Sequence, residues 1–417
     1  MKQKKTIVLV VSLILFSQLV KAEEMAHAIH SDKTLESVSS LNATLNEAEK
    51  SNPEILVAKK KWEEERAKIL AAGSLPDPEV GVEFWGKNET WYDVSQTVPF
   101  LVKLPLKAQS QAHEANREKG FYEAKQKEIL QKVKAAHYAY FLAWKEIEIF
   151  EESVSFLKQF STVAENKYSV NQTSQANVLK AQLEYSKTLN TLETLKQEKE
   201  ARAAELNALL DRIPDSPLPK PAEPSLPVAS LDYASLEKIA WQNRPELHAA
   251  RHHVNHMGAD LAVAQADFLP DATVQYSRRT FKNDMPDDNI VMVKFNVPFL
   301  WFWRQGAMVD AAAKAKEGAE AELRSMETMT RSDLKGLLVK TQNARRLVEL
   351  YRTTTIPQSE IALKVSLKGY EAGTEGFVDV IDSERSWLGF QLEYYQYLAE
   401  YWSYLASLER LVGRDLS

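Results

Sequence analysis

The chain repeats one pattern of residues, and this internal duplication restricts its fold more than any other feature of the sequence. Asn52-Pro53-Glu54-Ile55 in the first half corresponds to Arg244-Pro245-Glu246-Leu247 in the second. Ordered similarity at a nearly constant spacing indicates that one supersecondary unit occurs twice. Three further pairs follow in the same order: Leu75-Pro76-Asp77 with Leu269-Pro270-Asp271, Val98-Pro99-Phe100 with Val297-Pro298-Phe299, and Tyr168 with Tyr370.

A proline-rich stretch separates the two copies. Six prolines lie between Pro214 and Pro227. Each proline fixes φ and lacks a backbone donor, so this stretch is expected to be an extended linker. We therefore predict a first repeat at 23–212, a linker at 213–230 and a second repeat at 231–417.

The first residues have the features of an export signal. Three lysines precede an apolar run at 7–20, and a small-residue cleavage pattern ends at Ala22. We predict a signal peptide at 1–22 that directs the chain out of a bacterial cytoplasm. The chain has no cysteine, so neither a disulfide nor a cysteine-linked lipid anchor is expected.

Each copy is predicted to contain a helix, a β-hairpin and a long helical hairpin. Residues 34–72 have a helical pattern, and alternating apolar residues follow it in two short runs, which is typical of hairpin strands. The long helical patterns come next, with apolar steps of three and four that favour coiled-coil packing. A helix of about 60 residues would be roughly 90 Å long. In the second copy Pro357 interrupts the pattern and is expected to kink it.

The strands indicate that several chains assemble. Val291, Val293 and Phe295 alternate with Met292 and Lys294, as in a strand with lipid on one side and a polar interior on the other. No segment after the signal has the ~18 apolar residues of a spanning helix. Four strands are too few for a closed barrel, since bacterial barrels begin at about eight. Either several chains share one barrel, or the hairpins are outside a membrane and their aromatic residues fill a core.

The sequence resembles the TolC family of outer-membrane efflux ducts over nearly its whole mature length. The most specific segments are Tyr370-Glu371-Ala372-Gly373, then Val378-Asp379-Val380-Ile381-Asp382-Ser383, with a weaker first-copy counterpart at Tyr168 and at Asn177-Val178-Leu179-Lys180-Ala181. One further segment resembles the barrel-to-helix entry of the heavy-metal (cobalt-zinc-cadmium and copper) efflux branch. It is Gln96-Thr97-Val98-Pro99-Phe100, followed by Lys103-Leu104.

The resemblance implies a mainly α-helical homotrimer. Its duplicated helical hairpins would form an α-barrel tunnel in the periplasm, and four strands per chain would close a twelve-stranded barrel in the outer-membrane lipid. Such ducts conduct substrates, metal ions among them, passively to the exterior from a periplasmic adaptor and an inner-membrane pump. No catalysis and no cofactor are expected, and the sequence has no P-loop, HExxH or G-x-S-x-G motif. The net charge of -6 also makes nucleic acid a poor partner.

The candidate gate lies at the expected turns of the helical hairpins. Gly373, following Tyr370, is predicted to end a helix in a left-handed conformation. Asn171, following Tyr168, fits the equivalent place because asparagine tolerates that conformation. The resemblance places both turns at the periplasmic tips of the tunnel.

Two acidic residues follow the second turn. Asp379 and Asp382 are three apart, so a helix puts both carboxylates on nearly one face. Repeated in a trimer, they would form negative rings that attract cations at the tunnel mouth. Alternatively, they only favour the positive end of the last helix. The family's ionic lock cannot form, because Glu375 and Asn177 stand where its arginine and aspartate would be.

A histidine stripe provides a candidate metal site. His248, His252 and His256 recur every four residues, and Asp260 extends the stripe. Imidazoles at this spacing can chelate Zn²⁺ or Cu²⁺ from one helix face. The alternative is a solvated helix face rich in histidine. Two other functions are open on the residues alone: a periplasmic adaptor with one long α-hairpin, and a metal-binding coiled-coil scaffold.

Overall fold

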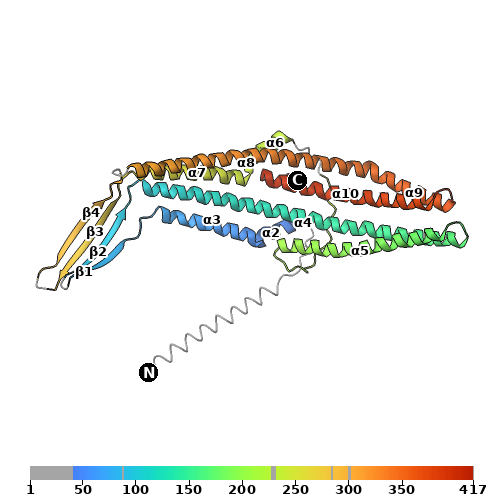
Figure 1. The fold of residues 1–417 in the computed structure, drawn as a ribbon, viewed down its shortest axis with the longest axis horizontal. Helices are drawn as coiled ribbons and strands as arrows, with labels where there is room; N and C mark the ends of the chain where they lie inside the picture. The colour runs from blue at the N-terminus through green and yellow to red at the C-terminus, as the bar shows by residue number, and fades with distance from the viewer. Residues whose placement is uncertain (1–40, 87–88, 227–231, 283–284, 299–301, 417) are drawn as a thin grey trace, which may run out of the picture.

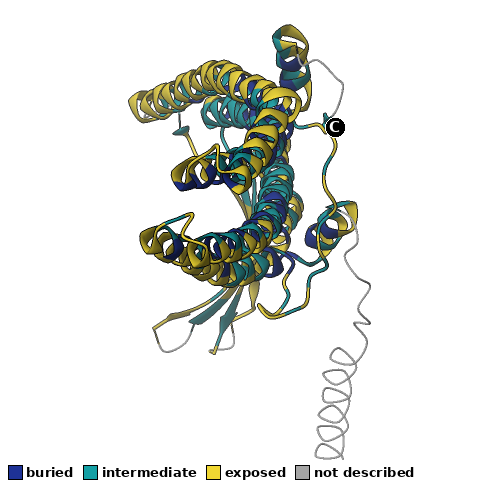
Figure 2. Ribbon diagram, turned by 90° about the vertical axis from the view of Figure 1, so that its right-hand side faces the viewer, coloured by how far each residue is buried: buried dark blue, intermediate teal, exposed yellow. Residues whose placement is uncertain are grey.

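The computed structural model describes residues 41–416 except 87–88, 227–231, 283–284 and 299–301, so the predicted signal peptide lies outside the described residues. The molecule is long and narrow, with four strands at one end and two helix turns at the other (Figure 1). Seen along its length, the helices form a curved layer rather than a closed bundle (Figure 2). The prediction of a mainly α-helical chain with a small β portion is confirmed.

The same order of elements occurs in both halves. The first half contains α2 (Leu41–Ser51), α3 (Pro53–Ala72), β1 (Glu79–Trp85), β2 (Glu89–Val98), α4 (Lys103–Ser169) and α5 (Gln175–Leu209). The second contains α6 (Tyr233–Asn243), α7 (Pro245–Ala266), β3 (Ala272–Phe281), β4 (Asp288–Phe295), α8 (Phe302–Leu350), the π-helical turn η2 (Tyr351–Thr355), α9 (Ile356–Ala372) and α10 (Phe377–Val412). The predicted repeat boundaries stay predictions.

The strands of both halves form one antiparallel sheet in the order β1-β2-β3-β4. β2 and β3 join the halves through a register that runs from Glu89 opposite Phe281 to Val98 opposite Ala272. Alternate residues of β4 leave large apolar side chains exposed: Val291, Val293 and Phe295. A sheet with one apolar exposed face needs a further apolar environment to cover it.

A buried lysine connects the sheet to the helices. Lys103, the first residue of α4, is 3% exposed, and its Nζ lies 2.8 Å from Oδ1 of Asp271 before β3. The same oxygen accepts a hydrogen bond from the backbone N–H of Phe100 at 2.9 Å. A charge buried this far is tolerated when it is paired and hydrogen-bonded. This pair therefore holds the start of α4 against the entry to β3.

In each half, the helix that returns from the tip ends beside the short helices that precede the sheet. Nδ2 of Asn52 donates to the carbonyl oxygen of Leu209, the last residue of α5, at 2.9 Å. Oδ1 of the same residue accepts from the N–H of Glu54 and caps α3. In the second half Gly413, with a φ of 74°, ends α10 so close to Asn243 that a Cβ would lie 2.2 Å from its carbonyl oxygen. Asn52 also breaks the helical pattern that was predicted as continuous over 34–72.

None of the helices that the structure describes combines the length and apolarity that crossing a membrane requires.

Candidate functional site at the helix turns

The two turns at the end opposite the sheet have left-handed residues at the predicted places. Gly373 has a φ of 80° and its N–H donates to the carbonyl oxygen of Tyr370 at 3.2 Å. Asn171 has a φ of 60° and its N–H donates to the carbonyl oxygen of Tyr168 at 3.0 Å. A side chain other than glycine or asparagine is strained in this conformation. Both turns therefore depend on the residue types that the sequence analysis singled out.

An aromatic core lies beneath the turns. The Tyr370 ring is 5% exposed and its centre lies 5.2 Å from that of Phe160 on α4. Phe377 at the start of α10 is also 5.2 Å from Phe160. This cluster packs the second hairpin against the first, and Lys167 lies over the Tyr370 ring at 5.2 Å. Tyr168, by contrast, is 44% exposed and is not part of the core.

The two acidic residues have different surroundings. Oδ2 of Asp379 accepts a hydrogen bond from the N–H of Gly376 at 2.9 Å, which caps the first turn of α10. The Asp382 side chain is 67% exposed, and its carboxylate lies 3.8 Å from Arg385. Asp379 thus stabilises the helix end, as the alternative interpretation expected, and both residues are exposed in a single chain.

Glu375 and Asn177 contact their own turns. The N–H of Glu375 donates to the carbonyl oxygen of Gly369 at 3.2 Å. Nδ2 of Asn177 donates to Oγ1 of Thr173 at 3.0 Å, and its N–H donates to Oγ of Ser174. Among the described residues, neither side chain makes a hydrogen bond or an ion pair with the other hairpin.

A different ion pair joins the two hairpins, and the sequence analysis missed it. Nη2 of Arg385 on α10 lies 2.5 Å from Oε1 of Glu184 on α5. The two residues are 201 positions apart, so no local pattern could have paired them. The Arg385 side chain is 52% exposed and that of Glu184 is 20% exposed, which leaves the pair accessible to salt.

A buried carboxyl group lies next to this ion pair in the sequence of α10. Glu384 is 3% exposed and accepts a hydrogen bond from the Ser153 hydroxyl of α4. Burial raises the pKa of the Glu384 carboxyl, and the charge of Glu184 raises it further. The tip region therefore contains a buried acidic group that takes up a proton more readily than a free carboxyl group does.

The histidine stripe lies on α7, facing α4. Nδ1 of His256 is 2.9 Å from Oγ of Ser110, and Nε2 is 3.5 Å from Oδ2 of Asp260. Nε2 of His248 contacts the carbonyl oxygen of Gln242 at 2.9 Å. The ring of His252 lies 6.0 Å from that of His113 on α4, a neighbour that the sequence analysis did not consider. Within the described ranges, no three His, Cys, Asp or Glu side chains are grouped so that they could hold a metal ion.

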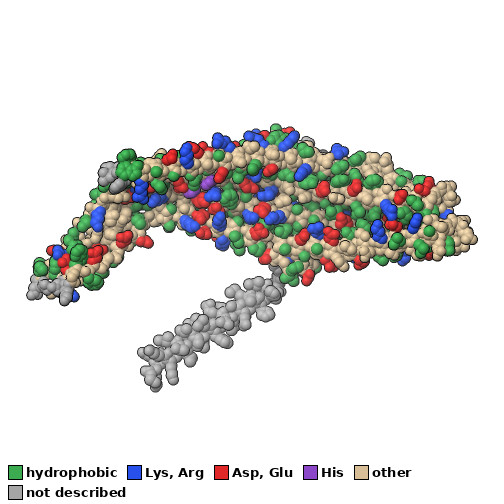
Figure 3. All heavy atoms as spheres, viewed as in Figure 1, with side chains coloured by type: hydrophobic (Ala, Val, Ile, Leu, Met, Phe, Trp, Pro, Cys, Tyr) green, Lys and Arg blue, Asp and Glu red, His purple; other side chains and the backbone are tan. Residues whose placement is uncertain are grey.

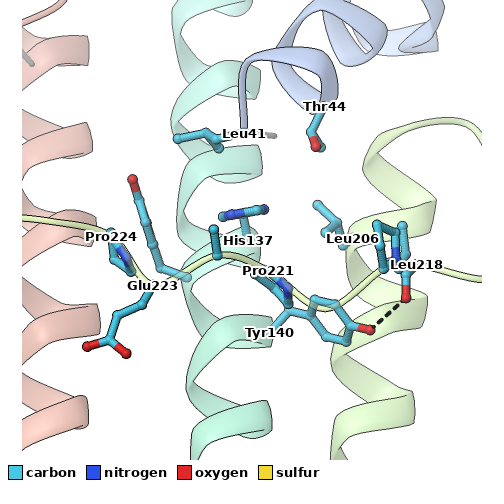
Figure 4. A pocket seen from close by; sticks show the side chains of 12 residues that line it. Leu41, Thr44, His137, Tyr140, Leu206, Leu218, Pro221, Glu223 and Pro224 are labelled. Atoms are coloured by element: carbon cyan, nitrogen blue, oxygen red, sulfur yellow. Dashed lines mark hydrogen bonds between the residues drawn. The ribbon is translucent and has the colours of Figure 1, made fainter. Parts of the chain in front are cut away.

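His137 lines a small pocket in the middle of the molecule. The pocket has a volume of about 230 Å³ and lies between α2, α4, α5 and prolines of the linker (Figure 4). The hydroxyl of Tyr140 donates to the carbonyl oxygen of Leu218 at its edge. Burial lowers the pKa of His137 to about 4, so its ring is neutral at pH 7.

The surface of the helical body carries both signs of charge. Acidic and basic side chains are interspersed along its length, with apolar side chains between them (Figure 3). The histidines visible on this face lie in the part of the helical body nearer the sheet. A mixed surface of this kind does not attract one class of polyion.

Comparisons with known proteins match part of the chain to one family and nearly all of it to one fold. Residues 236–414 match the family described as outer membrane efflux protein. The cobalt-zinc-cadmium resistance protein CzcC of Cupriavidus metallidurans is 22% identical over 396 residues, which are 90% of each chain.

Solved structures show the same architecture. The structure of CusC has a TM-score of 0.79 at 16% identity and covers 90% of this chain and 92% of that one. The outer membrane protein VceC of Vibrio cholerae has a TM-score of 0.76 at 15% identity, with coverages of 90% and 97%. At such identities the likeness shows the fold.

Proposed function

We propose that this chain, whose residues 236–414 match the outer membrane efflux protein family, is the outer-membrane channel of a tripartite efflux system. The observation that carries the proposal is the long helical body with a four-stranded sheet at one end and paired helix turns at the other. The similarity extends over nine tenths of the chain, so it includes both the sheet and the helix turns. Members of the family act as conduits and not as enzymes.

The sheet would be completed by two further chains. Among the described residues β1 and β4 each have one strand neighbour, so both sheet edges have backbone groups free to pair. Three such sheets placed edge to edge would close a twelve-stranded barrel. Its outward face would carry the exposed apolar residues of β4 against outer-membrane lipid.

The helical body would extend into the periplasm towards an adaptor and an inner-membrane pump. The periplasmic adaptor considered above would have one α-hairpin wrapped in β-domains. The described residues instead have two helical hairpins and one sheet. This arrangement favours the channel.

We place the cation-attracting ring of the mouth at Asp382. Both residues are exposed in the single chain, but the carboxylate of Asp379 is engaged in the cap of α10. Three copies of Asp382 around a common axis would concentrate negative charge where cargo enters. Replacing Asp382 with Asn should reduce divalent-cation block of the current across a planar bilayer, and an unchanged block would place the mouth elsewhere.

Metal ions are the cargo class that we propose. CzcC, by its name, is a cobalt-zinc-cadmium resistance protein, and α7 of this chain carries the histidine stripe. The predicted stripe of His248, His252, His256 and Asp260 stays a prediction as a metal site.

The experiment that tests the channel is the native mass and cell fraction of the detergent-extracted protein. We expect a trimer in the outer membrane. Val293→Lys places a charge on the apolar face and should cost about 2–4 kcal/mol if that face meets the bilayer core. Lys294→Glu on the opposite face is the matched control and should leave the outer-membrane fraction unchanged. A monomer in the periplasm would contradict the proposal.

A further inference from the structure

Five of the six described histidines lie along one helix interface. The chain has eight, of which His27 and His30 fall outside the described residues. Only His137 lies elsewhere, and four of the others, His248, His252, His253 and His256, lie on α7. The fifth, His113, lies on α4, which packs along α7. The interface therefore brings imidazoles of both halves of the chain together.

Two of these rings face each other without a partner. The ring centres of His113 and His252 are 6.0 Å apart, with planes inclined by 33°. Nδ1 of each ring is buried and makes no hydrogen bond to any described residue. A buried polar atom normally has a partner, because losing its hydration costs free energy. Two such atoms on neighbouring rings point to a shared ligand.

The other histidines are already engaged. His256 contacts Ser110 and Asp260, and Nε2 of His248 contacts the backbone of Gln242. His253 is directed towards Glu322 of α8, with Nε2 3.8 Å from the carboxylate. Nδ1 of His253 is also buried without a hydrogen bond, but its Nε2 faces Glu322. Among the described histidines at this interface, His113 and His252 are the neighbouring rings with no hydrogen bond or ion pair to a described residue.

We propose that His113 and His252 together bind one transition-metal ion of the kind that prefers imidazole, such as Zn²⁺ or Cu²⁺. A Zn–N bond is about 2.0–2.1 Å, so two rings that share an ion have centres about 5.2 Å apart at the tetrahedral angle and about 6.4 Å apart when they lie on opposite sides of the ion. The observed separation of 6.0 Å lies between these two values, so a tetrahedral ion would draw the two rings closer by about 1 Å. Two protein ligands suffice for a site completed by water, and no third side chain is invoked.

The site would connect the two halves of the chain. His113 belongs to the long helix of the first half and His252 to the second half. A bound ion would therefore act as a link between α4 and α7. The inference concerns these two helices only and does not depend on what passes through the channel.

The test is Zn²⁺ titration of the detergent-extracted full chain by calorimetry after chelator treatment. We expect one ion per chain at pH 7.5. His113→Gln and His252→Gln should each weaken binding by about tenfold or more, and the double variant should bind no more weakly than either single one, because the ion needs both rings. His253→Gln is the matched control and should bind within about twofold of the parent. All variants retain His27 and His30, so any contribution from these residues is common to all.

Two results would overturn the inference. One is unchanged affinity in His113→Gln, which would place the ion on the α7 stripe alone. The other is the lack of Zn²⁺ binding by the parent. A second arm needs no variant: at pH 5.5 the parent should lose affinity by about tenfold or more, since imidazole ligands must be neutral. Undiminished binding at pH 5.5 would indicate carboxylate ligands such as Glu114 and would also count against the pair.

Discussion

The two long helices that lead away from the sheet differ in continuity. In the first half α4 runs unbroken over 67 residues, from Lys103 to Ser169. In the second half the corresponding run is divided into α8 and α9 by the π-helical turn η2. Pro357, where the sequence predicted a kink, lies in the first turn of α9. A proline lacks the N–H of a regular helix, and a wider turn before it accommodates the missing bond.

The neighbours of the two helices explain why only one is divided. α4 packs against α3, α5, α7 and α10, so it lies in the middle of the layer. α8 packs chiefly against α7 and α10. An interruption in α4 would disturb contacts on several sides, whereas one in the second run disturbs few. Continuity thus follows from how many elements enclose a helix as much as from its own residues.

The largest effect is expected in the buried cluster to which α4, α8 and α10 all contribute. Phe141 of α4 is 1% exposed and packs with Val348 of α8 and Leu398 of α10. Phe141→Ala should reduce the free energy of unfolding by about 3–5 kcal/mol, because it leaves a cavity between the halves. Urea denaturation followed by circular dichroism measures this loss. Phe121→Ala, at a side chain that is 39% exposed, is the control and should cost much less; equal losses would show that the middle is not a shared core.

A second prediction concerns the buried middle of α4. The pKa of His137 is lowered from 6.5 to about 4, so the unfolded chain binds a proton there before the folded chain does. Stability should therefore fall as pH falls from 6.5 to 4, by at most about 3 kcal/mol from this residue. In His137→Gln this part of the acid dependence should disappear. If the free energy of unfolding depends on pH in the same way in the parent and the variant, water reaches the His137 ring.

The third prediction restores the backbone N–H that Pro357 lacks. Pro357→Ala adds an N–H to the first turn of α9 and should make the second run more like α4. We expect amide hydrogen exchange around η2 to slow by about tenfold, equal to about 1.4 kcal/mol of local opening. Amides in the middle of α4 serve as the internal reference. Unchanged exchange would show that the turn is held by other contacts, such as that of the Tyr351 hydroxyl with Glu393.

The smallest effect is expected at the ion pair between the hairpins. Arg385 and Glu184 are partly exposed, so their coupling in a cycle of Arg385→Gln and Glu184→Gln should be under about 1 kcal/mol. Even so, either change should raise the frequency of channel opening in bilayer recordings, because the pair joins α10 to α5. Both variants should respond alike, and the double variant should add little. Closed-state lifetimes equal to those of the parent would show that this ion pair does not hold the channel closed.

Local patterns predicted the elements well. Alternation and helical spacing predicted both hairpins and the long helices, and a glycine and an asparagine marked the turns at Gly373 and Asn171. These features depend on residues that are close in sequence. The break at Asn52 was missed because its cap and its bond to Leu209 matter only once α5 has ended beside it.

Contacts between the halves could not be predicted from periodicity. Arg385 with Glu184 and His113 with His252 each join distant segments. Their pairing depends on the rotation of one long helix against another, and helical spacing leaves that rotation open. The functional roles assigned to the turn residues and to the histidine stripe stay predictions for the same reason: they concern how chains or ions meet.

The edges of the sheet have a consequence for how the protein is made. In the described chain β1 and β4 end the sheet with backbone groups that await strands from elsewhere. Completion of the fold is then a reaction between molecules, and its rate rises steeply with the concentration of newly exported chains. Until partners arrive, each chain presents two adhesive edges and an uncovered apolar face to its surroundings. A low concentration of chains therefore prolongs the time for which these edges and the apolar face are exposed.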